Sequence, residues 1–455
     1  MRFLGSRGNL IQFRRDPIAY MRRLHERYGE ITAFVQGRTG TVFAFGPKYN
    51  QQLLSNPALF HSTGMPVPGP KNSAQKRISY SLFNMNDEKH ACQRRLITPP
   101  FHKQSIDAYR DTLVEKTEQL LKRWAVGQRI DVAQEMKHLT IGVAGKILFD
   151  FNDADAREIG TIIDSWMRVS TSASVRLFPK DWPGTSYHRM LRQAERLEQK
   201  IRAMIARRRL AGATGKDVLS ILIRSQEESG GALSDDEVLG QTTILFSAAH
   251  ETTANTLTWT LFLLAQHPQV TGRLMDELHG VLQGNAPASE QLCQLPLLDH
   301  VIKESMRVLP AVPYSTRTSV APFELGPYQL PAKTTVAYSH YITHHLSGLY
   351  PESERFLPDR WLTIHPSPYE YLPFGAGPRM CIGATFATMT LKVALAMILQ
   401  RFNLNVVRGA RVNRGAAVTM FPKGGLTMNV ESPTHSPRFI PVRGNIHDMV
   451  NLEHP

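Results

Sequence analysis

One of the three cysteines, Cys381, lies in a glycine-rich segment that runs from Phe374 to Gly383. Glycines at positions 375, 377 and 383 let the backbone turn tightly and approach a partner closely. Such a turn can direct several backbone N–H groups at one sulfur and hold it as a thiolate that faces a metal ion. A helical pattern, Ala384 to Arg401, follows directly. The segment therefore predicts a metal-binding cysteine, and the alternative is a buried structural cysteine in a turn.

An acid and two threonines interrupt a long apolar helical pattern at Ala248 to Thr253. Ser234 and Glu237 have the spacing of a capping box, and no proline follows before Gln266, which predicts a helix of about 32 residues and ~48 Å. A threonine can bond back to the carbonyl four residues earlier, so we expect a locally widened turn. The two alanines before His250 leave room for a flat cofactor. Taken alone, the acid and the threonines could simply be solvated.

The pattern F-G-x-G-x-R-x-C-x-G, which the cysteine segment matches, resembles that of the cytochrome P450 superfamily. This resemblance implies a mainly α fold with minor β sheets, a triangular helical prism around haem b. It implies that Cys381 is the metal ligand, the axial thiolate of the haem iron. The resemblance covers about residues 10–430, and we expect one domain over residues 1–455, with residues 431–455 as a C-terminal extension of unknown role.

The same resemblance assigns catalytic and cofactor-binding roles around the long helix. Glu251 and Thr252 match the acid–alcohol pair that delivers protons during oxygen activation, and Phe374 and Ala248 are expected to contact the haem. Ala249 departs from the family, which usually has glycine there.

Residues Glu304 and Arg307 are three apart and would share one face of a helix. The spacing alone means little, because Glu352 and Arg355 repeat it and a surface pair is worth only ~0.3–0.5 kcal/mol. The segment 356–361 matches the family's F-x-P-E-R-W pattern, with Asp for Glu. The resemblance therefore makes Glu304, Arg307 and Arg360 a buried structural triad that locks the cysteine segment to the core. Arg355 is the competing third member.

Haem propionates need cations, because buried carboxylates are costly when they are unpaired. The family's pattern appears at His90 and Arg94, which are four residues apart and would share a helix face. Arg317 and Arg379 match the other usual contacts. For His90 alone, a satisfied core histidine is the alternative.

The bulk composition restricts the class of protein. The chain has 455 residues and a net charge of +14. Its basic residues are dispersed and no tract alternates with aromatic residues, which disfavours nucleic acid. The net positive charge has two interpretations: the basic residues are simply solvated on the surface, or they bind an acidic partner protein. Three cysteines form no disulfide framework, and neither a signal peptide nor a spanning segment is visible, so we expect a soluble, cytoplasmic, bacterial monomer. Cys92 and Cys293 are interpreted as small buried hydrophobic residues.

Periodicity predicts the main elements. Two β hairpins are expected, at Glu30 to Phe45 with a turn at Gly37 to Gly40, and at Val418 to Val430. Besides the long helix, helical patterns cover 105–124, 187–209, 269–282 and 384–401.

The leading hypothesis is a haem-thiolate monooxygenase that hydroxylates or epoxidises a lipophilic small molecule of the fatty acid, terpenoid or steroid class. It would use O2 and electrons from an acidic ferredoxin or flavodoxin with its reductase, because the chain carries no flavin or iron–sulfur pattern of its own. The alternatives are a P450 that uses peroxides or rearranges hydroperoxides, and a non-enzymatic haem-thiolate sensor.

Overall fold

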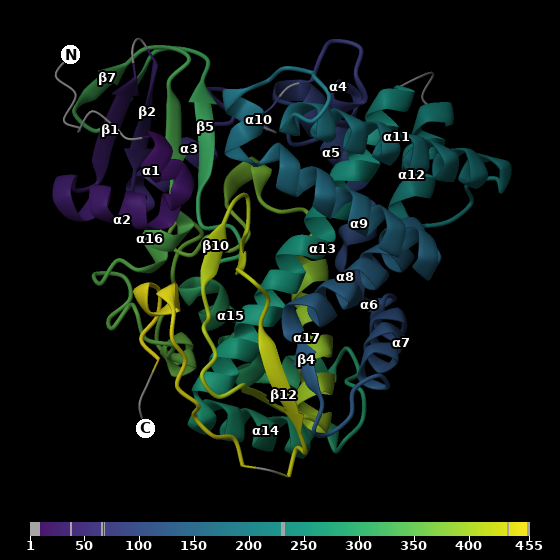
Figure 1. The fold of residues 1–455 in the computed structure, drawn as a ribbon, viewed down its shortest axis with the longest axis vertical. Helices are drawn as coiled ribbons and strands as arrows, with labels where there is room; N and C mark the ends of the chain where they lie inside the picture. Colours follow the sequence, from purple (N-terminus) through teal and green to yellow (C-terminus); the bar gives the residue numbers. More distant parts are fainter. Residues whose placement is uncertain are drawn as a thin grey trace. The chain divides into compact units, whose positions relative to one another are not determined.

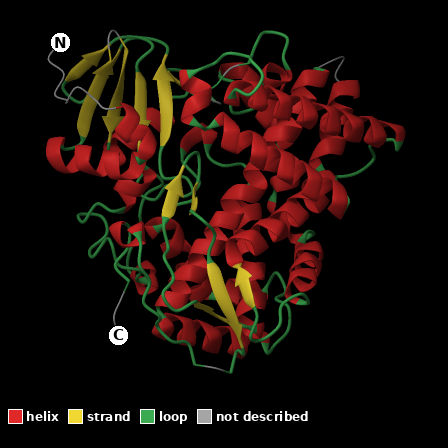
Figure 2. Ribbon diagram, viewed as in Figure 1, coloured by secondary structure: helices red, strands yellow, loops and turns green. Residues whose placement is uncertain are grey.

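Helices make up most of the computed structural model, with short strands between them (Figure 2). The structure describes residues 10–36, 39–64, 67, 69–228, 233–434 and 436–452 (Figure 1). The chain groups into two compact units: the first comprises Met1–Leu59, Asp107–Leu139 and Glu251–Pro455, and the second comprises Phe60–Ile106 and Thr140–His250. Along the chain, helices α8 (Val132–Phe149) and α13 (Asp235–Gln266) each continue from one unit into the other. The expectation of a single domain stays a prediction.

The first unit contains a mixed sheet with strands in the order β1-β2-β8-β5. Strand β1 is antiparallel to β2, and β5 is antiparallel to β8, whereas β2 and β8 are parallel. The hairpin predicted at Glu30 to Phe45 is therefore confirmed, although residues 37 and 38 of its turn lie outside the described residues. The strands are β1 (Ile31–Gln36), β2 (Thr39–Ala44), β5 (Ser315–Ser319) and β8 (Thr335–Tyr338).

The second predicted hairpin, Val418 to Val430, is wrong. Strand β11 (Met420–Pro422) pairs with β10 (Arg414–Ala416), whereas β12 (Thr427–Glu431) pairs with β9 (Asn403–Val406) and β4 (Arg129–Asp131). Between β11 and β12, Gly424 and Gly425 have φ of 91° and 84°, a left-handed conformation that suits glycine. Two such residues in succession redirect the chain away from β11. The remaining strands, β6 (Phe323–Leu325) and β7 (Tyr328–Leu330), pair with each other.

Helix α17 (Ala384–Arg401) lies in the core of the first unit and follows the cysteine segment. Most of its side chains are buried, and it packs against α7, α14 and α15. A helix that is apolar on nearly every side is stable only when it is covered by neighbours. The other helices of this unit are α1 (Leu10–Arg15), α2 (Pro17–Tyr28), α3 (Pro47–Ser55), α7 (Arg110–Leu121), α14 (Pro268–Leu282), α15 (Pro296–Val308) and α16 (His340–His344).

The second unit is helical, and its longest complete helix is α11 (Ser186–Leu210). This helix packs against α9 and α4, while α12 packs against α5. Alongside the short strand β3 (Phe60–His61), its helices are α4 (Ala74–Ile78), α5 (Asp87–Ile97), α9 (Asp153–Ser170), α10 (Ala173–Leu177) and α12 (Val218–Glu228). Helix α6 (Lys103–Asp107) ends at the unit boundary.

The helix predictions hold with one exception. Helices α11, α14 and α17 match their predicted ranges to within a residue or two, and α13 begins and ends as predicted. The range predicted at 105–124 is instead divided into α6 and α7. Helices α8 and α9 have no counterpart among the sequence expectations.

The described residues beyond strand β12, 432–434 and 436–452, are an integral part of the first unit. Ile446, Met449 and Val450 are buried. The backbone of Asn451 bonds to Glu354 O at 2.8 Å, and Arg22 of α2 donates to Asp448 O at 2.6 Å. The C-terminal segment 436–452 therefore contacts residues 354–355. The carbonyl oxygen of Arg355 in this stretch also accepts a hydrogen bond from Arg307.

Candidate active site

The cysteine segment is a tight loop held against α3. Gly375 and Gly377 have φ of 68° and 70°. A Cβ atom on Gly377 would lie 2.1 Å from the carbonyl oxygen of Leu54 in α3, so only glycine allows this approach. The backbone N–H of Cys381 donates to Phe374 O at 2.8 Å and closes the loop. The loop therefore delivers Cys381 in a fixed backbone position directly before α17.

The thiol of Cys381 is exposed in this structure, as are those of Cys92 and Cys293. The interpretation of Cys92 and Cys293 as buried hydrophobic residues is wrong. Cys92 lies on the outer side of α5 and Cys293 in a short 3-10 helix, Gln291–Gln294, both of which face solvent there. Exposure alone does not distinguish Cys381; its loop does.

The predicted triad is brought together as an ion-pair network in the first unit. Glu304 and Arg307 are 0% exposed. Arg307 donates to both carboxylate oxygens of Glu304, at 2.8 Å from Nη2 and 2.9 Å from Nε. Arg360 Nε donates to Glu304 Oε1 at 2.9 Å. The backbone N–H of Leu357 and the indole of Trp361 add further donors at 3.0 Å each. The Glu304 carboxylate thus accepts hydrogen bonds from five donors.

Arg307 also connects α15 to the chain that precedes the cysteine loop. Its guanidinium donates to the carbonyl oxygens of His344, Ser353 and Arg355 at 2.8, 2.7 and 2.9 Å. The side chain of Arg355, the competing third member, instead donates to Glu352 at 2.6 Å on the surface. Arg360 is therefore the residue that the structure brings to Glu304. That the triad locks the cysteine loop stays a prediction.

Glu251 and Thr252 lie midway along α13, whose first turn has the predicted capping box. Ser234 N donates to Glu237 Oε2 at 2.8 Å, and Glu237 N donates to Ser234 Oγ at 3.2 Å. The helix is α-helical throughout, so the expected widened turn is absent from it. A regular helix keeps the i−4 ladder, and here Thr256 Oγ1 bonds back to Thr252 O at 3.0 Å without opening it.

The carboxylate of Glu251 has a partner that the sequence did not indicate. Thr419 Oγ1 donates to Glu251 Oε1 at 2.8 Å, and Thr419 is buried. Nothing in the local sequence signals this contact, because the two residues are 168 positions apart. Ala248 and His250, earlier in α13, belong to the second unit, where His250 Nδ1 lies 2.8 Å from Phe246 O.

The predicted propionate-binding residues lie in both units. Arg317 is on β5, with its guanidinium 5.7 Å from the centroid of the Tyr338 ring, and Arg379 is within the cysteine loop. Burial, together with the positive charge of Arg317, lowers the pKa of His340 to about 4. His90 is buried on α5 of the second unit, and Arg94 follows one turn later on the same helix. Their shared contact with a haem stays a prediction.

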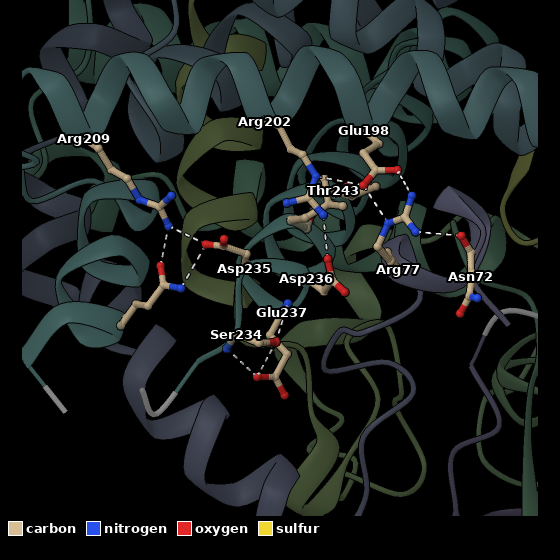
Figure 3. A network of polar contacts seen from close by, with 12 residues as sticks. Asn72, Arg77, Glu198, Arg202, Arg209, Ser234, Asp235, Asp236, Glu237 and Thr243 are labelled. Atoms are coloured by element: carbon tan, nitrogen blue, oxygen red, sulfur yellow. Dashed lines mark hydrogen bonds and ion pairs between the residues drawn. The ribbon is translucent and has the colours of Figure 1, made fainter. Parts of the chain in front are cut away.

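The beginning of α13 is tied to α11 and α4 by a chain of ion pairs within the second unit (Figure 3). Arg77 makes a bidentate pair with Glu198 at 2.6 and 2.7 Å. Glu198 also accepts from Arg202, which reaches Asp236 at 2.6 Å. Burial alone would raise the pKa of Glu198, but the hydrogen bonds from the two arginines outweigh it and hold that pKa below its usual value. The chain of pairs fixes the first turn of the helix that carries Glu251.

Among the residues that the structure describes, no group of three or more His, Cys, Asp or Glu side chains is placed to hold a metal ion. His340 and His344 are buried, and burial holds the pKa of His344 well below its ordinary value. His344 Nε2 accepts from the backbone N–H of Leu372 at 2.7 Å, which is a structural role just before the cysteine loop.

Comparison with known proteins identifies the class that this fold and loop define. The family model described as cytochrome P450 matches residues 3–424, and the chain belongs to that family. It is a cytochrome P450 monooxygenase. Among solved structures, the retinoic acid-bound cyanobacterial CYP120A1 has a TM-score of 0.80 at 22% identity, covering 91% of this chain and 94% of that one, which shows the shared fold.

Two bacterial relatives cover nearly the whole chain. The chain is 33% identical to the cyclooctat-9-en-7-ol 5-monooxygenase of Streptomyces melanosporofaciens over 411 residues, which is 88% of each protein. It is 27% identical to the pentalenene oxygenase of Streptomyces avermitilis over 437 residues, which is 94% of this chain and 95% of the relative. Of the helices in the described part of the chain, none is long and apolar enough to span a membrane.

The family implies a haem, and the residues of the first unit fit one. Cys381 offers a soft thiolate donor on an exposed face. Within the described chain, nothing lies within 4 Å of the position that a Cβ on Gly375 would take, so the loop is open there. A loop closed behind its cysteine and open beside it can accept a flat, iron-containing group.

Proposed function

We propose that this monooxygenase hydroxylates or epoxidises a terpenoid, using O2 and electrons from a separate redox protein. The chemical class rests on the two Streptomyces relatives, whose names specify oxidation of cyclooctat-9-en-7-ol and of pentalenene. The observation that carries the reaction type is the loop of Cys381, which the family match covers.

Cys381 is proposed to hold the iron of haem b. The bound group would supply oxygen activation, and the thiolate of Cys381 would favour that chemistry by donating electron density. His90, Arg94, Arg317 and Arg379 are proposed to pair with its propionates, because carboxylates removed from water need cationic partners. Phe374 and Ala248 are proposed to contact the ring.

Side chains of the protein itself are proposed to deliver protons and to hold the site together. Glu251 is proposed to hold a proton and pass it on. Thr252 is proposed to orient the hydrogen bond along which that proton is passed. A positioned proton donor of this kind contributes roughly 10²–10⁴-fold in rate. Glu304, Arg307 and Arg360 are proposed to act only through the fold, by keeping the segment before the cysteine loop in place.

The redox partner is proposed to be an acidic ferredoxin or flavodoxin. The net charge of +14 favours an acidic protein, and Arg95 is exposed on α5, next to the proposed propionate partner Arg94. Arg95→Glu should slow reduction by such a partner, with an effect that shrinks as salt rises, since screening acts over about 8–10 Å. The control is Arg157→Glu on α9, which reverses the charge of another exposed arginine. Equal slowing in both variants would contradict docking at Arg95.

The ligand assignment is tested by the spectrum of the reduced carbon monoxide complex. Cys381→Ser should abolish the thiolate-type band, because an alcohol donates far less charge. Cys92→Ser is the matched control, since it removes another exposed thiol and should leave the band unchanged. A thiolate-type band that survives in Cys381→Ser would refute the assignment.

Substrate class is tested by titrating the purified protein with a panel of terpenes, fatty acids and steroids and following the high-spin Soret shift. Terpenoids should give the shift at the lowest concentrations. If only fatty acids or steroids produce it, the terpenoid proposal is wrong while the reaction type stands.

A further inference from the structure

Three side chains on one face of α13 contact the same short segment of the first unit. Glu251, Asn255 and Trp259 are spaced four residues apart, so they form a stripe about 12 Å long. Glu251 and Asn255 bond to the hydroxyl of Thr419, at 2.8 and 3.3 Å, and Trp259 Nε1 donates to Met420 O at 3.2 Å. The acid of the proposed proton relay is thus one end of a continuous contact.

The direction of the hydrogen bonds at Thr419 follows from its neighbours. The amide nitrogen of Asn255 can only donate, so the hydroxyl oxygen of Thr419 accepts from it. The single hydroxyl proton is then committed to Glu251 Oε1. Asn255 therefore orients Thr419, and Thr419 orients Glu251.

The segment that carries Thr419 is itself held in place. Met420 N donates to Ala311 O at 2.8 Å, and Ala417 N donates to Thr419 O at 3.0 Å. Met420 and Trp259 are 0% exposed, so the hydrogen bond between them is inside the core of the unit. The Thr419 hydroxyl consequently has little freedom to follow the carboxylate if that group moves.

The two oxygens of the Glu251 carboxylate are not equivalent. Oε1 is bound to Thr419, whereas Oε2 makes no hydrogen bond or ion pair with any residue in the described ranges. Glu251 is also partly exposed, unlike its partner. One oxygen is anchored, and the other is left to exchange a proton.

We infer that Thr419 is a positioning residue for the monooxygenase reaction: it anchors Glu251 Oε1 so that Oε2 is the oxygen that accepts and releases protons. This inference rests on the proposed relay role of Glu251. The competing explanation is that the Thr419–Glu251 bond only ties α13 to its neighbour. The two differ in what loss of the hydroxyl does to the use of electrons.

The decisive variant is Thr419→Val, which removes the hydroxyl and keeps the side-chain volume. We expect product formed per reducing equivalent to fall about ten- to hundredfold, the effect of losing one hydrogen bond to a charged group. The KM should stay within about twofold, and the lost equivalents should appear as peroxide. Thr419→Ser keeps the hydroxyl and should restore coupling. Thr427→Val, an exposed threonine on β12, is the matched control and should behave as the parent does.

A readout that needs no turnover comes from thermal unfolding of the purified variants. Thr419→Val and Glu251→Ala each remove one partner of the same hydrogen bond, so the double variant should lose less melting temperature than the sum of the two single losses. Strictly additive losses would overturn the inference, because Thr419 would then not be coupled to the carboxylate in solution.

The outcomes separate this inference from the proposed function. If Glu251→Gln uncouples the enzyme and Thr419→Val does not, the relay stands and the positioning role of Thr419 is wrong. If Glu251→Gln leaves coupling unchanged, the relay role itself is wrong, and the positioning role falls with it. If Thr419→Val raises KM and lowers the melting temperature but keeps coupling, Thr419 is only a structural tie.

Discussion

Replacing Glu304 by glutamine tests whether the buried ion-pair network is what keeps the cysteine loop in place. The substitution changes one atom and one charge. It leaves Arg307, which is 0% exposed, without its counter-ion. It also puts an NH2 group among five hydrogen-bond donors that converge on the carboxylate.

The magnitude follows from those contacts. Removing one partner of a buried ion pair costs about 3–5 kcal/mol, because the remaining charge stays buried without compensation. At least one neutral donor, the backbone N–H of Leu357 or the indole of Trp361, also loses part of its partner, at about 1–3 kcal/mol. These terms are not additive, and we expect a total loss of about 4 kcal/mol. A domain with a stability of roughly 5–15 kcal/mol would keep its fold only marginally.

Glu352→Gln is the matched control, because Glu352 and Arg355 have the same three-residue spacing on the surface. Their side chains are 56% and 38% exposed, and an exposed pair contributes only about 0–1 kcal/mol. Both variants are titrated with denaturant, and the loss of haem absorbance is followed together with the loss of helical secondary structure. Glu304→Gln should lower the midpoint strongly and lose haem before its helices melt, while Glu352→Gln should match the parent. Equal midpoints for the two variants would refute the reasoning, since burial would then make no difference to the pair.

Three further predictions follow from other contacts. Thr252→Ala should leave the fold intact, because Thr256 bonds to the backbone carbonyl of residue 252, yet product per reducing equivalent should fall while peroxide rises; an unchanged yield would contradict the proton role. On acidification from pH 6.5 to pH 5, His340 takes up a proton in the unfolded chain but stays neutral in the folded protein, where burial lowers its pKa to about 4. Stability should therefore fall by about 1.6 kcal/mol from this residue, and an unfolding midpoint that does not depend on pH would contradict its burial. Truncation after Thr434 removes the buried side chains of Ile446 and Met449, each worth about 2–5 kcal/mol; a truncated protein with the parent's melting temperature would show that the C-terminal segment is dispensable.

The fold could be predicted from the sequence where its signals are local. Capping residues and a proline-free apolar run marked both ends of α13, and the alternation around residues 31–44 marked the first hairpin. The failure at Val418 to Val430 has a physical cause. Strand alternation says that a segment is extended, but the partner of each strand is decided by long-range packing, and β12 pairs with strands that precede it by more than 20 residues.

The same limit applies to buried charges. Glu304–Arg307 and Glu352–Arg355 have one spacing and opposite environments, the first at 0% exposure and the second on the surface. Helical spacing brings two side chains together in either case and says nothing about what covers them. The sequence separated the two pairs only through a third residue, Arg360, in a segment that matches a family pattern.

The environment of Glu251 shows which part of the site could not be predicted from the local sequence. The sequence marked the acid, because a carboxylate in an apolar helix is unusual, but the group that orients it is a threonine 168 residues away in an otherwise ordinary loop. A threonine hydroxyl carries no signal of its own, and it matters here because Asn255 and the buried Met420 fix its direction. Chemistry-bearing residues can therefore be found by type and spacing, whereas residues that aim them become visible only once packing has brought distant segments together. For the proton relay proposed for Glu251, the direction of its two carboxylate oxygens decides which of them can exchange a proton.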